Sequence, residues 1–455
     1  DRQPQSRRVR PPFLLHEIRR QPRRNRVGVL HVRPSRRARI RGRPALRSAD
    51  GRFTAELHGV VQFDAGAYFQ HDLPAAQTDA HARDLNDGTN FRRARIGVGG
   101  KAFGDFNYNV LLDFGGYGSE DAGKIQEAWV EYAGLPHARF RVGAFAPLLG
   151  LEDAVSTNSM LFLERPAIAE ISRTLAGGDR RTGAQAAFGG DHWLAAVAVT
   201  GNGVSTLNTT ASALGSQNYD EQLGYTGRLA FSPLHGEDYL VHIGANGSLV
   251  TQPADAGPTA AARYGIQLSD RPELSLDSTR LSDAGLIDAD GARQWGLELA
   301  VQKKNFYLEG EYFDIAIQRR NPLLSDPDFK GWYVEGGWVL TGEPRRYNPL
   351  TAAFDGPSVA RPFGKDGSYG AFELAARYSV ADLNYHDGSA GSATPADGVR
   401  GGEQKIIAAG LNWYFNSDVR LMFQYQHVDI ERLNSAGADI GQSFNTLAVR
   451  SQVAF

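Results

Sequence analysis

Long stretches in which apolar and polar residues alternate constrain the fold of this 455-residue chain more than any other feature. Over residues 53–69, Phe53, Val61 and Phe63 belong to an apolar face, while side chains such as Gln62 belong to the opposite face. A period of two is typical of a β-strand that is apolar on one side only. This stretch is much longer than an ordinary strand, and strands of such length are typical of barrels that cross a lipid bilayer.

The alternation recurs along the chain and predicts sixteen strands. We expect them at about 53–69, 93–101, 106–114, 125–132, 139–144, 183–189, 193–200, 222–231, 239–248, 294–303, 306–317, 332–341, 369–383, 405–415, 419–432 and 447–455. Long loops alternate with short turns between them, apart from the long return segment 342–367. The pattern predicts an all-β fold, a 16-stranded antiparallel transmembrane β-barrel, which is large enough to surround an aqueous lumen.

Residues 145–183 interrupt this pattern because they show no strand periodicity. Segments of this kind in compact domains are more often functional than connective. In the predicted strand order they form the third external loop, and we expect this long third loop to fold into the lumen and narrow it. Basic residues of the loop are expected either to contact solutes or to pin the loop by pairing with its acidic residues; they are Arg173, Arg180 and Arg181, with Glu164, Glu170 and Asp179 as partners.

The first 47 residues form a different kind of sequence. They contain 16 arginines and two acidic residues, a formal charge of +14, so the rest of the chain sums to −16. Such a segment cannot bury enough apolar surface to fold alone. We therefore expect residues 1–49 to be a disordered Arg/Pro-rich leader, non-native in origin, and residues 50–455 to form the barrel. The alternative for the leader is a basic arm that binds nucleic acid or anionic lipid; we expect no nucleic-acid partner.

Composition and motifs argue against other classes. The chain has no cysteine, which excludes disulfides and thiol catalysis, and no run of 18 apolar residues that would predict a transmembrane helix. No nucleophile elbow, P-loop or zinc-binding histidine pair is found, so we expect no enzyme, cofactor or metal. Two alternatives remain, a barrel-borne hydrolase and a non-conducting structural or adhesive barrel. The histidines that a hydrolase could use are scattered over different predicted strands and loops: His58, His71, His192, His242 and His427.

Several basic residues fall on the strand face opposite the apolar stripe, and a barrel would direct this face toward its lumen. They are Arg93, Arg95, Lys101, Arg139 and Arg141. A guanidinium stays charged and offers a planar fork to oxyanions, so a series of arginines provides weak successive sites, as conduction requires. The alternative for each residue is an ordinary solvated charge on a polar wall.

Residues 50–455 resemble the phosphate-selective porin O/P family of Gram-negative outer membranes. The resemblance rests on NFRRARIGVGGKAFGDFNYNVLLDF at 90–114, VGAFAPLLGLEDAVSTNSMLFLERPA at 142–167, TGEPRRY at 341–347 and LNWYFN at 411–416. It implies a lipid-embedded homotrimer whose third loop lies in the lumen and whose arginines lead small anions such as phosphate along the channel.

The resemblance also implies roles for individual residues. Arg165 matches the family's constriction arginine, Arg92 and Arg93 match its FRRA pair, and Ser156 and Thr157 match a hydroxyl pair. The remaining matches are Arg271 in the arginine ladder, Arg263 and Arg280 as nearby ladder candidates, and Phe455 as the terminal residue that barrel-assembly machinery recognises.

The chain departs from the family's pattern at positions that matter for cargo. Asp153 stands where phosphate-selective members have a lysine, and Glu56, Val60 and Asn107 stand at three further basic positions. A phosphate in a narrow neck needs several convergent donors to replace its water. We therefore expect a porin for small hydrophilic solutes that prefers anions, with phosphate or polyphosphate as the favoured cargo but without tight phosphate specificity.

Overall fold

The computed structural model describes residues 44–70, 79–115, 123–175, 179–204, 220–236, 238–364 and 366–455. Most of the expected leader lies outside these residues, so its disorder and its origin stay predictions. The described part of that range contains a short strand, β1 (Ala45–Arg47), which pairs with residues 54–56 at the start of the first barrel strand.

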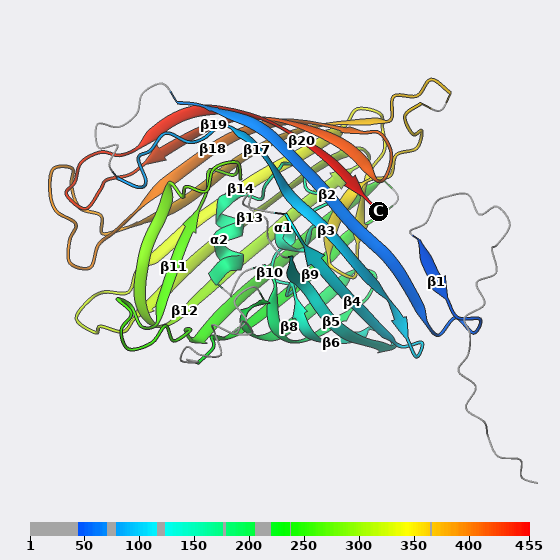
Figure 1. The fold of residues 1–455 in the computed structure, drawn as a ribbon, viewed down its shortest axis with the longest axis horizontal. Helices are drawn as coiled ribbons and strands as arrows, with labels where there is room; N and C mark the ends of the chain where they lie inside the picture. The colour runs from blue at the N-terminus through cyan, green and yellow to red at the C-terminus, as the bar shows by residue number, and fades with distance from the viewer. Residues whose placement is uncertain are drawn as a thin grey trace, which may run out of the picture. The chain divides into compact units, whose positions relative to one another are not determined.

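Sixteen strands form one closed antiparallel β-barrel, which confirms the predicted fold class (Figure 1). Each barrel strand pairs with the next in the chain, and β2 pairs with β20 to close the sheet, from Val60 opposite Ala454 to Phe69 opposite Asn445. The barrel strands are β2 (Thr54–Phe69), β3 (Gly88–Ala102), β4 (Phe106–Asp113), β5 (Lys124–Leu135), β6 (Ala138–Phe145), β7 (Arg181–Gly189), β8 (Trp193–Gly203), β9 (Leu223–His235), β10 (Tyr239–Gln252), β12 (Ser282–Lys303), β13 (Phe306–Arg319), β14 (Asp328–Val339), β17 (Ala371–Tyr385), β18 (Val399–Tyr414), β19 (Val419–Glu431) and β20 (Gln442–Ala454).

The two faces of the barrel wall differ as the alternation requires. On β20, Leu447 and Val449 are exposed on the outer face, while Thr446 and Arg450 on either side of them are fully buried on the inner face. The same contrast holds on β12, where Leu297 is exposed and Glu298 is buried. A wall that is apolar outside and polar inside is the arrangement of a membrane-spanning barrel around a lumen.

The described residues of the third loop, 146–175 and 179–180, fill part of the space inside the barrel. It contains two helices, α1 (Leu151–Ala154) and α2 (Ala167–Leu175). Side chains on the inner faces of β18 and β19 donate hydrogen bonds to its backbone carbonyls, as Asn412 does to Leu161 and Arg420 does to Met160, each at 2.9 Å. Neither helix of the described residues is long or apolar enough to cross a membrane.

Helix α2 begins directly after Pro166, whose carbonyl accepts the backbone N–H of Glu170 at 3.0 Å, and the residues that follow have apolar side chains at helical spacing. Ile168 and Ile171 are fully buried, and they pack in a cluster with Phe313 and Ile315 on the inner face of β13. The alternation breaks on this part of β13 because its inner face meets a helix instead of water.

Two further segments enter the lumen. Between β10 and β12, residues 253–281 include β11 (Gly265–Asp270), and their Glu273 accepts the backbone N–H of Ala167 at the start of α2 at 2.9 Å. A carboxylate at this end of a helix is favourable because the helix dipole is positive there. The long return segment between β14 and β17, recognised in the sequence only as an exception, forms a hairpin of β15 (Arg345–Asn348) and β16 (Ala353–Pro357).

The strand boundaries differ most where loops were predicted. β12 begins at Ser282 instead of about 294, and β18 begins at Val399 instead of about 405. The glycines and aspartates of residues 282–293 suggested a loop, but part of this stretch pairs with β11 beyond the region where lipid would impose strict alternation.

Candidate functional site

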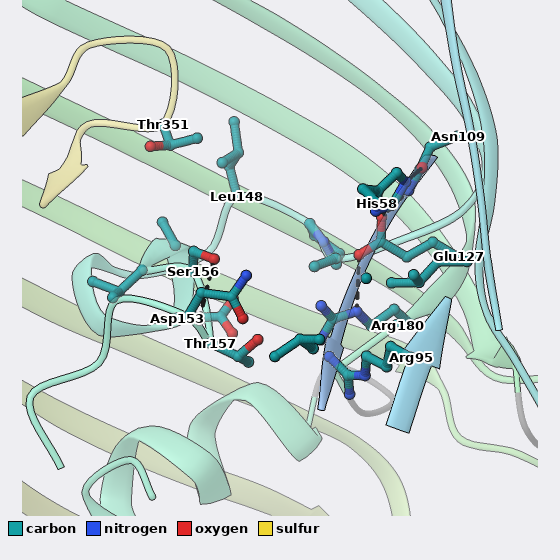
Figure 2. Close-up of a pocket in the computed structure, with 18 of the residues that line it drawn as sticks. His58, Arg95, Asn109, Glu127, Leu148, Asp153, Ser156, Thr157, Arg180 and Thr351 are labelled. Carbon is teal, nitrogen blue, oxygen red and sulfur yellow. Dashed lines mark hydrogen bonds and ion pairs between the residues drawn. The ribbon is translucent and has the colours of Figure 1, made fainter. Parts of the chain in front are cut away.

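Loop 3 and the inner wall of β2–β6 enclose a cavity of about 340 Å³. In Figure 2, Asp153, Ser156 and Thr157 of the loop face Arg95 and Glu127, which come from strands of the wall. Thr351 from the tip of the β15–β16 hairpin also lines the cavity (Figure 2). Four arginines line it altogether: Arg95, Arg141, Arg165 and Arg180.

Three of these arginines are paired with carboxylates. Arg95 Nε lies 2.6 Å from Asp113, and Arg141 Nη2 lies 2.7 Å from Glu131. Arg180 pairs with Glu127 at 3.1 Å from Nε and with Asp179 at 2.8 Å from Nη1. Each carboxylate offsets most of the positive charge of its arginine and accepts some of its N–H groups. An oxyanion in the cavity would therefore find only part of the N–H donors free. Guanidinium groups arranged in this way favour weak over tight contacts with an oxyanion.

Arg165 is buried, and its side chain holds two parts of loop 3 together through hydrogen bonds to the backbone. Its Nε donates to the backbone carbonyl of Glu152 at 3.1 Å, and its Nη2 donates to that of Val155 at 2.7 Å. Burial lowers the pKa of Arg165, and the neighbouring Arg173 lowers it further, against the opposing effect of nearby carboxylates. The structure thus places the predicted constriction arginine at the cavity and also gives it a structural role.

Asp153 lines the same cavity, as a modifier of the constriction should. Its carboxylate lies 2.6 Å from Arg173 Nε, an arginine of helix α2. Arg173 also pairs with Glu170 at 3.0 Å and lies 3.8 Å from Asp179. The expected pinning of the loop by Arg173 and Arg180 through Glu170 and Asp179 therefore agrees with these contacts.

The FRRA pair contacts loop 3 and does not line the cavity. A β-bulge in β3 leaves Arg92 between the residues opposite Gln62 and Phe63, so Arg92 and Arg93 both reach the inner side. Arg92 binds Glu164 through two hydrogen bonds of 2.6 and 2.9 Å, and Arg93 Nη2 lies 3.8 Å from the same carboxylate.

Glu164 is the centre of this anchor. Arg450 of β20 donates to it at 2.9 Å and binds Asp64 of β2 through two hydrogen bonds of 2.6 Å. Burial raises the pKa of Glu164, but the guanidinium groups of Arg92, Arg93 and Arg450 outweigh burial and hold it well below its ordinary value. Glu164 is therefore charged at any physiological pH, and the anchor persists across that range.

The other predicted pore residues lie in several places. Lys101 lines a separate cavity with His58 and Asn109, and Arg139 donates to the carbonyl of Leu350 at the hairpin. Ser156, Thr157 and Phe455 line the arginine-lined cavity, and the backbone of Phe455 also pairs with Gly59. Arg263 is half-exposed and pairs with Asp255 at 2.7 Å. Arg280 donates to the carbonyl of Ser269 at 2.9 Å, and Arg271 lies next to Asp270 in the lumen segment that contains β11.

Sequence reasoning missed several arginines that shape the lumen. Arg450 follows the alternation of β20 and could have been assigned to the inner face, as could Arg377 on β17. Arg345 lies in the return segment, where no periodicity indicated its direction; its Nη1 donates to Glu373 at 2.9 Å. The sequence predicted that Arg180 pins the loop, and in the structure Arg180 also lines the cavity.

Comparison with known proteins gives consistent results. A family model described as phosphate-selective porin O and P matches residues 63–455. Porin O of Pseudomonas aeruginosa is 28% identical over 375 residues, which cover 79% of this chain and 81% of that protein. An uncharacterised protein of Caulobacter vibrioides is 26% identical over 418 residues, covering 89% of this chain and 76% of the relative.

Solved structures with a similar fold are outer-membrane channels and related barrels. The outer-membrane channel DcaP of Acinetobacter baumannii matches with a TM-score of 0.50 and 10% identity, covering 90% of this chain and 99% of its own. OmpT of Vibrio cholerae matches with a TM-score of 0.50 and 10% identity, covering 90% and 100%. At such low identity these matches concern the fold alone.

Proposed function

This chain belongs to the phosphate-selective porin O and P family, and from this premise we propose that its lumen passes small anions in preference to cations. The protein is a porin of the Gram-negative outer membrane, with a water-filled channel for small hydrophilic solutes. The observation that carries the proposed preference is the cavity beside loop 3, which brings four arginines together. Phosphate and polyphosphate are the favoured cargo.

The affinity for phosphate is expected to be low. Asp153 and Glu127 line the cavity with the arginines, and three of the four arginines are already paired with carboxylates. A tight phosphate site would need free donors that converge on one point. Weak binding at several steps agrees better with transport than one deep well does.

Planar-bilayer recording of the refolded protein tests this function. In a KCl gradient we expect discrete conductance steps and a reversal potential of the sign that chloride permeation gives. Phosphate added at increasing concentration should then reduce the chloride current. A reversal potential of the opposite sign would contradict the anion preference, and an absence of conductance would favour a structural or adhesive barrel.

Arg180→Ala should weaken the block of chloride current by phosphate. Arg180 lines the cavity and pairs with Glu127 and Asp179, so its loss removes one positive charge and leaves two carboxylates without their partner. We expect the half-blocking phosphate concentration to rise about three- to tenfold, the loss of one charge-assisted hydrogen bond in a partly hydrated site.

Arg165→Ala should weaken the same block, and it should also make the open-channel current noisier because Arg165 holds two carbonyls of the loop. Arg263→Ala is the matched control, since Arg263 is half-exposed and paired with Asp255 away from the cavity. If all three variants are blocked like the wild type, the cavity is not the phosphate site.

Assembly and partners form the rest of the proposal. We propose a homotrimer in the outer-membrane lipid, recognition of Phe455 by the barrel-assembly machinery, and no catalytic or nucleic-acid-binding activity. Mass measurement of detergent-solubilised protein tests the trimer, and Phe455→Ala should lower the yield of folded barrel in the outer membrane. Turnover of ester or lipid substrates by the refolded protein would contradict the proposal that it is not an enzyme.

A further inference from the structure

Three carboxylates meet where loop 3 touches the wall opposite the arginine-lined cavity. Glu152 belongs to helix α1, Glu309 to β13 and Glu335 to β14. One carboxylate oxygen from each lies within 4.8 Å of the others, and all three side chains are buried, with at most 2% of their surface exposed. Together these residues form the carboxylate triad.

Local positive charge does not balance this group. Arg377 Nη2 lies 2.6 Å from Glu335, but Nη1 of the same guanidinium binds Glu273 at 3.0 Å. Arg165 Nε comes no nearer than 3.9 Å to Glu152 and donates to a backbone carbonyl instead. A further carboxylate, Glu311, accepts the backbone N–H of Leu151 and Glu152 beside the triad. Arg345 also lies near Glu309 but is paired with Glu373 at 2.9 Å, so three guanidinium groups face six carboxylates.

Glu152 also lacks the hydrogen bonds that a buried carboxylate requires. Its Oε1 is buried and has no hydrogen-bond partner among the residues that the structure describes. The other two members are satisfied in part, because Glu309 accepts the hydroxyl groups of Tyr307 and Tyr333, and Glu335 accepts Arg377. An unpaired charge in a dry site costs several kcal/mol, so a compensating group is required.

We propose that Glu152, Glu309 and Glu335 bind a divalent cation, Ca²⁺ in preference to Mg²⁺, which joins helix α1 to the barrel wall. Calcium takes six to eight oxygen ligands at about 2.4 Å in irregular arrangements, so two oxygens of one ion lie at most about 4.8 Å apart. The three carboxylate oxygens, which all lie within 4.8 Å of one another, fall inside this limit. Magnesium, with bonds of about 2.1 Å, needs a tighter and more regular set of oxygens. The carboxylates supply the hard anionic oxygens that such ions select.

The cation would act on the loop and not on the transported anion. Glu152 is adjacent to Asp153, and its backbone carbonyl accepts a hydrogen bond from Arg165, so one ion would fix the position of two cavity-lining residues. The proposal is independent of the channel's ion preference, because binding can be measured in protein that conducts no current.

Calcium binding to the refolded, full-length protein in detergent micelles tests the proposal. After treatment with EDTA and its removal, ⁴⁵Ca²⁺ equilibrium dialysis should show one saturable class of sites, with Mg²⁺ a weaker competitor. Glu152→Gln and Glu309→Gln each remove one charged ligand of similar shape, and each should weaken this class by about tenfold or more. Glu403→Gln is the matched control, since that carboxylate pairs with Lys405 on β18 and should leave binding unchanged.

Folding of each variant is checked by gel electrophoresis of unboiled and boiled samples, because the folded barrel and the unfolded chain migrate differently. Equal Ca²⁺ affinity in both triad variants and the control, or no saturable binding in the wild type, would overturn the proposal. A variant that does not fold is replaced by the aspartate substitution at the same position, which shortens the ligand and should weaken binding in the same way.

Unfolding by urea in the presence of EDTA or of Ca²⁺ separates a cation site from a triad that holds no metal. A ligand that binds only the folded state raises the free energy of unfolding. Saturating Ca²⁺ should therefore stabilise the wild type more than Glu152→Gln, and equal stability of the wild type with EDTA and with Ca²⁺ would overturn the cation site.

Discussion

Replacing Arg450 with leucine should lower the free energy of unfolding of the barrel by about 3–5 kcal/mol, the cost of breaking a buried ion pair from one side. Arg450 is fully buried and binds both oxygens of Asp64, which is also fully buried, as well as Glu164 of loop 3. Leucine would leave Asp64 without its cation in a dry part of the wall. Urea unfolding of the refolded protein in micelles, followed by tryptophan fluorescence, measures the change.

Arg263→Leu is the control for this prediction. It removes an ion pair with Asp255 at a similar distance, 2.7 Å, but the Arg263 side chain is 46% exposed. A pair of this kind contributes about 0–1 kcal/mol, because water and salt screen it. If the two variants lose equal stability, the buried network around Glu164 does not stabilise the barrel more than a surface contact does.

Removing the β15–β16 hairpin should raise the single-channel conductance by about twofold or more, because a constriction limits the current through a pore. Phe354 packs on Tyr307 of β13 with ring centroids 4.5 Å apart, and Arg228 of β9 donates to the carbonyls of Thr351 and Ala352 at 2.7 and 2.9 Å. The hairpin therefore lies against the inner face of the wall at β9 and β13, and its Thr351 reaches the arginine-lined cavity. Replacing residues 345–357 by a short Gly-Ser turn, and recording current in planar bilayers, tests its effect.

A matched deletion in the β17–β18 loop, at residues 389–395, removes chain from a connection at the other end of the strands and should leave the conductance near the wild-type value. Equal conductance in the hairpin deletion and the wild type would mean that the narrowest point lies elsewhere, at loop 3 alone. A large increase that also abolishes phosphate block would mean that the hairpin helps to shape the cavity, which Thr351 lines.

The sequence predicted the barrel well because lipid imposes one rule on every spanning strand. The outward faces must be apolar, so Leu447 and Val449 alternate with buried Thr446 and Arg450 and identify both the strand and its orientation. The rule fails where a strand faces protein on its inner side or extends past the lipid. Inward-facing Ile315 and the early start of β12 at Ser282 were missed for these two reasons.

The arrangement of the site was less predictable. The alternation assigns Arg93, Arg95 and Arg141 to the lumen, but it cannot say which carboxylate each will meet, because the partners come from neighbouring strands or from a loop. Arg92 reaches the inner side only because of a β-bulge, which no residue pattern in β3 predicts. The resemblance predicts Arg165 as the constriction arginine, and the structure has it at the cavity, while its bonds to the carbonyls of Glu152 and Val155 depend on the fold of the loop.

The anchor of Glu164 has a consequence for the order in which the molecule is made. The ion-pair partners of Glu164, Arg92 and Arg450, come from the second and the last barrel strands. Arg450 also binds Asp64 of the first barrel strand, which is 386 positions away in the chain. These groups meet only when β2 and β20 pair. The contacts that hold Glu164 are therefore complete only in a barrel whose first and last strands have paired.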